Sequence, residues 1–239
     1  RRSSDLLIQQ AKEAKEASRV LMTAGAEIKN RALSAIADAL VARSGEWLSA
    51  NAEDMKAAEG KISVPMMDRL KLTPERIAGI ADGVRQVMNL PDPIGVVDKM
   101  SARPNGLIIG RRRVPLGVIA IIYEARPNVT ADAAVLCLKS GNVCILRGGK
   151  EAIRSNRAAV RIMQDALRGA GLPEACISLV QDTSHETAGE LMHLNDYVDV
   201  LIPRGGPGLI RSIVKNASIP VIRTGEGVCH VYIEREADL

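Results

Sequence analysis

The feature that most constrains the fold is the order of apolar runs and turns between residues 114 and 156. Residues 117–122 and 143–146 are short runs rich in Val and Ile, which is typical of strands buried on both faces. Residues 129–138 between them predict a helix, and Pro127 prevents an earlier start because the residue before a proline favours an extended conformation. Two parallel strands joined by a helix form a βαβ unit. The segment therefore predicts a parallel sheet.

The same alternation continues along the rest of the chain. Further helices are predicted at residues 153–170, 184–192 and 209–216, and further strands at residues 177–180, 197–202, 219–222 and 228–233. Five βα repeats joined by short loops predict an α/β fold with a doubly wound, Rossmann-like parallel sheet.

The residues before this sheet are predicted to be helical. Residues 6–23, 26–42 and 51–58 are rich in Ala, Lys and Glu, with apolar residues at helical spacing. Thr73 followed by Pro74 is typical of an N-cap and a first helical position, and this helix should run to about residue 88. We expect these helices to pack against the sheet.

A hairpin is predicted between the N-terminal helices and the sheet. Residues 96–100 and 107–114 flank a Pro-Asn-Gly turn at residues 104–106, which suits two antiparallel strands. Residues 111–113 are all Arg, and an edge strand protected by its charge is the favoured explanation.

Polar turns that follow the predicted strands indicate a ligand site, because parallel sheets bind ligands at the carboxyl ends of their strands. The turns at residues 123–128 and 147–150 share this end of the sheet, and together they predict a nucleotide pocket. The candidate contacts are Glu124, Arg126, Arg147, Gly148, Gly149 and Lys150. For Glu124 and Arg126, a local ion pair that braces the turn is an equally good explanation.

The cations near the second turn favour an anionic ligand. Lys150, Arg154, Arg157 and Arg161 lie at helical spacing on one face, and with Arg147 they could meet the 2′-phosphate of NADP. For Arg157 and Arg161, a solvated basic helix face is the favoured alternative.

A third turn contains Gly205 and Gly206 just before the predicted helix at residues 209–216. Free backbone N–H groups at a helix start suit a phosphate, and glycine lets a ligand approach closely. Arg211 breaks the GxGxxG spacing, and no P-loop motif occurs in the chain, so these glycines could also serve only as a turn.

Composition narrows the class of protein. The formal net charge is +4, and the chain contains no Phe and a single Trp, which argues against a base-stacking surface for single-stranded nucleic acid. No apolar run approaches the length of a membrane span. The four cysteines show no CxxC spacing, so we expect a reducing cytoplasm and no metal site. A basic module that binds nucleic acid through residues 111–113 and 154–161 is the alternative hypothesis.

Four motifs carry a resemblance that covers the whole chain. YEARPNVT, CLKSGN with ILRGGKEA, DVLIPRGGPGLI and TGEGVCHVYIE resemble the γ-glutamyl phosphate reductases, or glutamate-5-semialdehyde dehydrogenases, of the aldehyde dehydrogenase superfamily. The resemblance implies NADPH-dependent reduction of γ-glutamyl phosphate to glutamate 5-semialdehyde and phosphate, in proline biosynthesis. It also implies a homo-oligomer.

The resemblance divides the chain into parts. It implies that residues 1–93 and 114–226 form the NADP-binding domain and that residues 94–113 form a hairpin arm used in oligomerisation. Residues 227–239 would begin a catalytic domain whose remainder lies beyond the chain.

In this family a cysteine thiolate attacks the acyl phosphate and forms a thioester, to which the nicotinamide delivers hydride. Cys229 is the tempting candidate, but strand alternation would put Cys229 and His230 on opposite faces, so a packing role is favoured. The family's nucleophile lies further downstream, in an Arg-Pro-x-x-Cys-Asn-Ala type of motif. We therefore expect no catalytic nucleophile within residues 1–239 and no reductase activity from this fragment alone.

Asn128 is a candidate for substrate or oxyanion contact. Glu124 and Arg126 are candidates for contact with nicotinamide or the glutamyl carboxylates.

Overall fold

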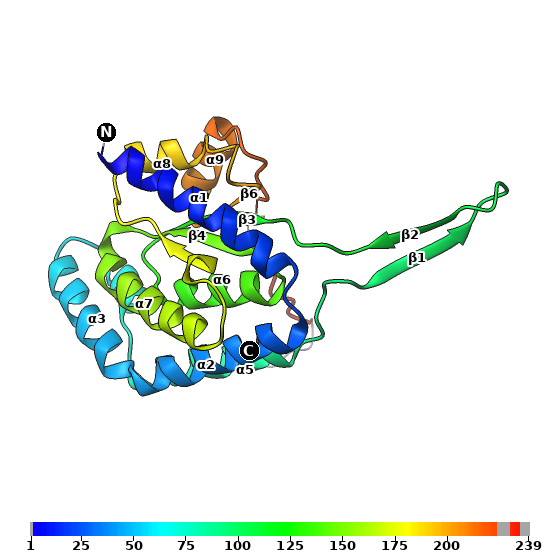
Figure 1. Ribbon diagram of the computed structural model, residues 1–239. Helices are drawn as coiled ribbons and strands as arrows, with labels where there is room; N and C mark the ends of the chain where they lie inside the picture. The colour runs from blue at the N-terminus through cyan, green and yellow to red at the C-terminus, as the bar shows by residue number, and fades with distance from the viewer. Residues whose placement is uncertain (1, 224–229, 235–239) are drawn as a thin grey trace.

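The structure is a computed structural model that describes residues 2–223 and 230–234. Its centre is a four-stranded parallel sheet in the order β5-β4-β3-β6, with helices on both faces, and a two-stranded antiparallel hairpin projects from one end (Figure 1). The strands are β1 (Val97–Ala102), β2 (Ile108–Arg112), β3 (Val118–Tyr123), β4 (Val143–Arg147), β5 (Ile177–Leu179) and β6 (Val200–Arg204).

The strand order creates a switch point in the sheet. β4 and β5 are added on one side of β3, and the chain then returns to place β6 on the other side, with Ile119 aligned between Cys144 and Val200. Every residue of β3 is buried, as its uninterrupted apolar run predicts. In open parallel sheets, ligands bind at the carboxyl ends of the strands next to such a point. The predicted α/β fold is confirmed.

The helices form layers around this sheet (Figure 1). α6 and α7 cover one face, with α2, α3 and α5 packed outside them, and α1, α8 and α9 lie on the other face. The longer helices are α1 (Arg2–Met22), α2 (Ala26–Ala42), α3 (Ser44–Ala58), α5 (Pro74–Asn89), α6 (Pro127–Lys139), α7 (Ile153–Gly169) and α9 (Pro207–Asn216), and the shorter ones are α4 (Val64–Leu70) and α8 (His185–Leu191). No described helix is long and apolar enough to cross a membrane.

Two helix starts follow the expected local rules. The Thr73 side chain accepts a hydrogen bond from the Arg76 backbone N–H at 3.2 Å, so Thr73 caps α5. Arg126 is extended, with φ −137°, and α6 begins at Pro127. Proline therefore sets the boundary between the turn after β3 and the helix that follows.

The strand predictions near the end of the chain are wrong in part. Residues 219–222 contribute a single parallel bridge between Leu201 and Val221, because Pro220 has no N–H to extend the ladder. Residues 230–233 form no strand, and Val231 and Tyr232 are almost fully exposed, so within the described residues they lack a neighbouring strand. The remainder of that predicted strand, residues 228 and 229, lies outside the described residues.

The outer edge of the sheet is closed by side chains. β5 is an edge strand, and its outward carbonyls would be open to pairing with another chain. Gln164 of α7 donates to the Ile177 carbonyl at 2.7 Å, and Gln10 of α1 donates to the Leu179 carbonyl at 3.0 Å. These two glutamines satisfy backbone groups that a further strand would otherwise use.

The hairpin of β1 and β2 forms as the Pro-Asn-Gly turn predicts, with Gly106 at φ +83°. β1 and β2 pair with each other and with no other described strand. Their apolar side chains, including Met100 and Ile108, are largely exposed. Of the basic run in this segment, Arg113 forms an ion pair with Asp98 at 2.9 Å.

Candidate functional site

Three turns meet at the carboxyl end of the sheet. The turn after β3 contains Glu124 and Ala125, the turn after β4 contains Gly149, and the turn after β6 contains Gly206. The Gly206 backbone N–H donates to Glu124 Oε1 at 2.9 Å. A Cβ added to Gly149 would lie 3.0 Å from the Ala125 nitrogen. The sequence-predicted turns are thus brought together around Glu124 and Ala125, at the switch point between β3 and β6.

Close approach explains the glycines of these turns. A Cβ at Gly205 would lie 2.8 Å from the Glu124 carboxylate. A Cβ at Gly148 would overlap the Asn156 amide and would come within 3.2 Å of the Tyr123 ring. Glycine at these two positions is therefore required by packing within the protein, whatever ligand the turns bind.

A buried hydrogen-bond chain supports the turn beneath Gly148. Tyr123 Oη and Thr130 Oγ1 are 2.7 Å apart, and Thr130 Oγ1 donates to Asn156 Oδ1 at 2.8 Å. Asn156 Nδ2 is buried and has no hydrogen-bond partner among the described residues. Burial raises the pKa of Tyr123 far above its usual range, so this hydroxyl stays protonated. The chain ties β3, α6 and α7 together below the candidate site.

Glu124 and Arg126 do not form the ion pair that was one of the two predictions for this turn. The Arg126 backbone N–H donates to the Glu124 carbonyl at 2.8 Å, but no ion pair joins their side chains. Glu124 reaches across to the start of α9, whereas Arg126 lines a separate cavity with Asn128, next to α5. The turn after β3 therefore directs Glu124 toward α9 and Arg126 toward the cavity beside α5.

Arg147 connects β4 to the loop before α8. Its Nη2 donates to the carbonyls of Thr183 at 2.7 Å and Ser184 at 3.1 Å, and its buried Nε has no hydrogen-bond partner in the part of the chain that the structure describes. Burial lowers the pKa of Arg147, while the nearby carboxylates of Glu151 and Asp182 act in the opposite sense. These two hydrogen bonds of Arg147 hold the loop before α8 against the end of β4, and they are made within the protein rather than to a ligand.

The other cations of the predicted basic face are held mostly by packing partners. Arg154 lies 3.2 Å from Glu53 and 3.4 Å from Asp54, both on α3. Arg161 forms an ion pair with Glu46, which is also on α3. Lys150 is exposed in the short 3₁₀ turn Lys150–Ala152 and lines a small cavity beside the end of α3.

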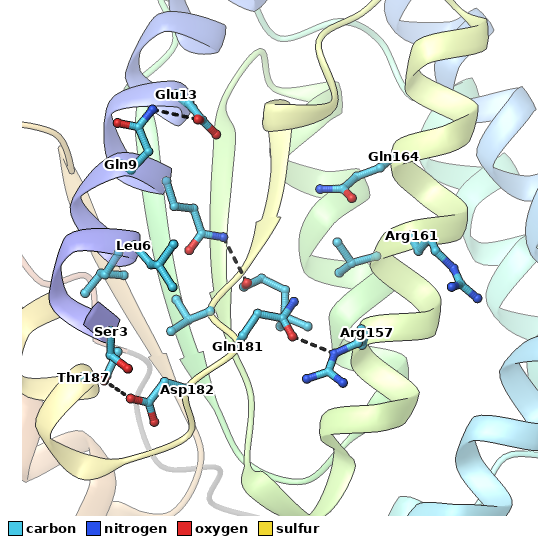
Figure 2. Close-up of a pocket in the computed structure, with 15 residues that line it drawn as sticks. Ser3, Leu6, Gln9, Glu13, Arg157, Arg161, Gln164, Gln181, Asp182 and Thr187 are labelled. Carbon is cyan, nitrogen blue, oxygen red and sulfur yellow. Dashed lines mark hydrogen bonds between the residues drawn. The ribbon is translucent and has the colours of Figure 1, made fainter. Parts of the chain in front are cut away.

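Arg157 lies in a different place. A cavity lies between α1, α7 and the end of β5 (Figure 2), and its volume is about 610 Å³. Within it, Arg157 Nε donates to Gln181 Oε1 at 2.6 Å. Among the residues that line this cavity, none belongs to the three converging turns. Arg157 and Arg161 are both exposed on α7, and the choice between a ligand contact and a solvated basic helix face stays a prediction for them.

The described cysteines are packing residues, as their apolar surroundings predict. Cys137, Cys144 and Cys176 are buried free thiols. A hydrogen bond from Cys137 and burial raise the pKa of Cys144, and burial raises the pKa of Cys176 to about 12. A thiol with a raised pKa supplies little thiolate at neutral pH. Cys229 lies outside the described residues, and the neighbouring His230 is exposed.

The start of α9 offers a place for an anion. Its N-cap, Gly206, makes no side-chain capping bond, and no atom of the described residues lies within 4 Å of a Cβ added to Gly208. A helix start of this kind leaves backbone N–H groups free to bind a phosphate. Because Glu124 holds this helix start against the end of β3, the anion site and the switch point coincide.

An open parallel sheet with glycine turns at the carboxyl edge and an uncapped helix start at the switch point is typical of the α/β proteins that bind dinucleotides. The family model described as "Aldehyde dehydrogenase family" matches residues 3–239. The chain belongs to the aldehyde dehydrogenase family.

Three similar proteins carry the name γ-glutamyl phosphate reductase. The chain is 57% identical over 234 residues to a γ-glutamyl phosphate reductase of Clostridium perfringens, covering 98% of this chain and 56% of that protein. A crystal structure of γ-glutamyl phosphate reductase from Thermotoga maritima matches with a TM-score of 0.91 at 41% identity, over 97% of this chain and 56% of that one. The corresponding structure from Saccharomyces cerevisiae matches with a TM-score of 0.83 at 31% identity, over 90% and 55%. The chain thus spans little more than half the length of these relatives.

Proposed function

We propose that this chain is the cofactor-binding part of an NADPH-dependent reductase that converts γ-glutamyl phosphate to glutamate 5-semialdehyde and phosphate, in proline biosynthesis in the cytoplasm. The observation that carries the proposal is the meeting of three turns at the switch point, where an uncapped helix start adjoins Glu124. Relatives named γ-glutamyl phosphate reductase support the choice of substrate.

The proposal assigns a role to each part of the chain. Residues 1–93 and 114–226 bind NADP(H), residues 94–113 are an arm through which copies of the chain assemble, and residues 227–239 begin the catalytic domain. The burial of Cys137, Cys144 and Cys176 supports a nucleophile from elsewhere in the protein.

The residues around the switch point fit a dinucleotide. The pyrophosphate would lie at the start of α9, next to the turn of Gly205 and Gly206, because the backbone N–H groups that follow Pro207 have no side-chain cap and no described atom fills the space beside Gly208. When bound, the nicotinamide supplies the hydride. Glu124 would fix the helix start relative to β3 and so set the position of the whole ligand.

The turn after β4 would select the phosphorylated cofactor. Arg147, Gly148, Gly149 and Lys150 lie at the neighbouring strand end, and Lys150 is exposed. A 2′-phosphate adds charge that a lysine or arginine can pair with, which NAD lacks. Ion pairs already occupy Arg113, Arg154 and Arg161, and this weakens the alternative of a nucleic-acid-binding module.

Thermal protection by cofactors tests the proposal. We expect NADP+ to raise the melting temperature of the protein more than NAD+ at equal concentration, since a ligand stabilises the state that it binds. Lys150→Gln should reduce the difference between the two cofactors. The control is Lys12→Gln, another exposed lysine, on α1, which should leave the difference unchanged.

Two results would contradict this assignment. Equal protection by NADP+ and NAD+ in the unmodified protein would remove the 2′-phosphate site. Protection by neither cofactor would remove the dinucleotide site altogether.

A further inference from the structure

A second cavity lies on the other side of the turn that follows β3. It has a volume of about 450 Å³ and is lined by the end of α4, the connection from α4 to α5, the first turns of α5, and the start of α6. Arg69 lines it from the end of α4 and Lys71 from the connection, and Arg126, Asn128 and Asp132 line it from the α6 side. Nothing in the proposed dinucleotide site uses this cavity.

The cavity has an excess of positive charge. Arg76 and Asp68, which also line it, neutralise each other in an ion pair of 2.9 Å. Arg69, Lys71 and Arg126 form no ion pair with any described residue. Three cations are therefore left to face a ligand, with one further carboxylate, that of Asp132.

Arg76 also holds the connection in place. Its Nη1 donates to the carbonyls of Asp68 at 2.6 Å and Lys71 at 2.7 Å. Hydrogen bonds from a charged group to two carbonyls fix a short segment well. Arg76 thus positions the backbone that carries Arg69 and Lys71, and its own guanidinium is already bound by Asp68 and by two carbonyls.

A carboxylate and an amide complete the lining. Asn128 Nδ2 donates to Asp132 Oδ2 at 3.2 Å, which leaves the other Asp132 oxygen able to accept a further donor. Cations and a carboxylate that face the same cavity match a ligand bearing both charges. An α-amino acid carries such a pair, a carboxylate beside an ammonium group.

We propose that this cavity binds the α-amino-acid end of the substrate, with Arg126 and Lys71 on its carboxylate and Asp132 on its ammonium group. The inference rests on the proposed function, since it names the part of the glutamyl substrate that the cavity recognises. The turn after β3 then separates two ligands: Glu124 holds the start of α9 on the dinucleotide side, and Arg126 faces the substrate side.

Substrate analogues test the inference in the full-length protein that contains this chain. The oxidative direction is measured with NADP+ and phosphate, using glutamate 5-semialdehyde, 4-aminobutanal without the carboxylate, and 5-oxopentanoate without the amine. We expect Arg126→Gln to raise KM for glutamate 5-semialdehyde and 5-oxopentanoate by about 10-fold or more, because a charge-assisted hydrogen bond is lost. KM for 4-aminobutanal, which has no carboxylate, should stay unchanged.

The acidic residue gives the converse pattern. Asp132→Asn should raise KM for glutamate 5-semialdehyde and 4-aminobutanal and leave that for 5-oxopentanoate unchanged. Arg126→Lys should recover part of the loss, because it keeps the charge but not the planar fork. Arg19→Gln, an exposed arginine on α1, is the matched control and should change nothing.

A binding measurement separates this inference from the proposed function. Calorimetric titration with L-glutamate should show binding that Arg126→Gln abolishes, whether or not the protein turns over any aldehyde. Absence of NADP+-dependent turnover together with Arg126-dependent binding would refute the reductase and keep the cavity assignment. Equal KM changes for all three aldehydes, or glutamate binding that Arg126→Gln leaves intact, would overturn the inference.

Discussion

At the scale of single residues, Gly117 shows how a backbone conformation and a side-chain contact fix one amino acid. Its φ is +120°, and an added Cβ would overlap the Asp199 carboxylate. Asp199 accepts from the Val118 backbone N–H at 2.8 Å and pairs with Lys15 at 2.8 Å. Gly117→Ala should therefore destabilise the protein by about 2–4 kcal/mol, from backbone strain and a weakened charge-assisted hydrogen bond. Urea unfolding measures this difference.

Gly83 provides the control for that substitution. It lies within α5, its φ is negative, and an added Cβ meets nothing within 4 Å. Gly83→Ala should stabilise the protein by about 0.5–1 kcal/mol, because alanine loses less backbone entropy in a helix. Losses of similar size in both variants would show that the strain assigned to Gly117 is absent.

The sequence identifies charged residues well but not their partners. Arg161 pairs with Glu46, and Arg154 pairs with Asp54, and in each case α3 and α7 are far apart in the chain. Helical spacing correctly puts the arginines on one face of α7. It cannot show that a second helix covers part of this face, because that depends on how the layers pack. The spacing therefore predicted a phosphate contact for Arg154, whose side chain has protein partners on α3, whereas a solvated face was the favoured explanation for Arg157 and Arg161.

At the scale of elements, the start of α7 depends on a residue from another helix. Its N-cap, Ala152, has no capping side chain. Asp54 of α3 is 1% exposed, and its Oδ2 accepts from the Ser155 backbone N–H at 2.7 Å and the Ser155 hydroxyl at 2.8 Å. Asp54→Ala should cost about 2–4 kcal/mol, because buried donors lose their acceptor. The free energy of unfolding in urea is the measurement.

The neighbouring Glu53 is the matched control. It is on the same helix and contacts Arg154 at 3.2 Å, but its side chain is 67% exposed. Glu53→Ala should cost less than about 0.5 kcal/mol, as exposed ion pairs contribute little. A small loss for Asp54→Ala as well would show that the α7 start does not need its distant cap.

Local signals predicted most of the elements and failed where tertiary contacts decide. Proline at position 127 and threonine at position 73 gave correct helix starts, because each acts on its own backbone. Residues 219–222 have the composition of a strand, but only Val221 forms a bridge. α4 was missed, since its seven residues carry too short a pattern to distinguish a helix from a loop.

At the scale of the whole molecule, the alternation of strands and helices correctly predicted a parallel sheet, whereas the end of the sheet at which ligands bind stays a prediction. It did not predict the order β5-β4-β3-β6, because side-chain patterns are alike for a strand on either side of β3. The meeting of Glu124 with Gly206 follows from this order. The same order places Glu124, on one side of the turn after β3, against α9, while Arg126 on the other side lines the cavity beside α5.

The hairpin arm gives the last prediction. Met100 is 64% exposed and Ile108 is 69% exposed, and their pairing with Gly110 and Ala102 puts both on one face. If copies of the chain assemble through this face, Met100→Glu with Ile108→Glu should convert the oligomer to a monomer in light scattering, because buried charges without partners oppose association. The melting temperature of the separated monomer should hardly change on further deletion of the arm, since β1 and β2 pair with no other described strand. Val64→Glu, at a residue 83% exposed on α4, is the control and should leave the assembly intact. An oligomer that survives the double substitution would mean that another surface holds the copies together.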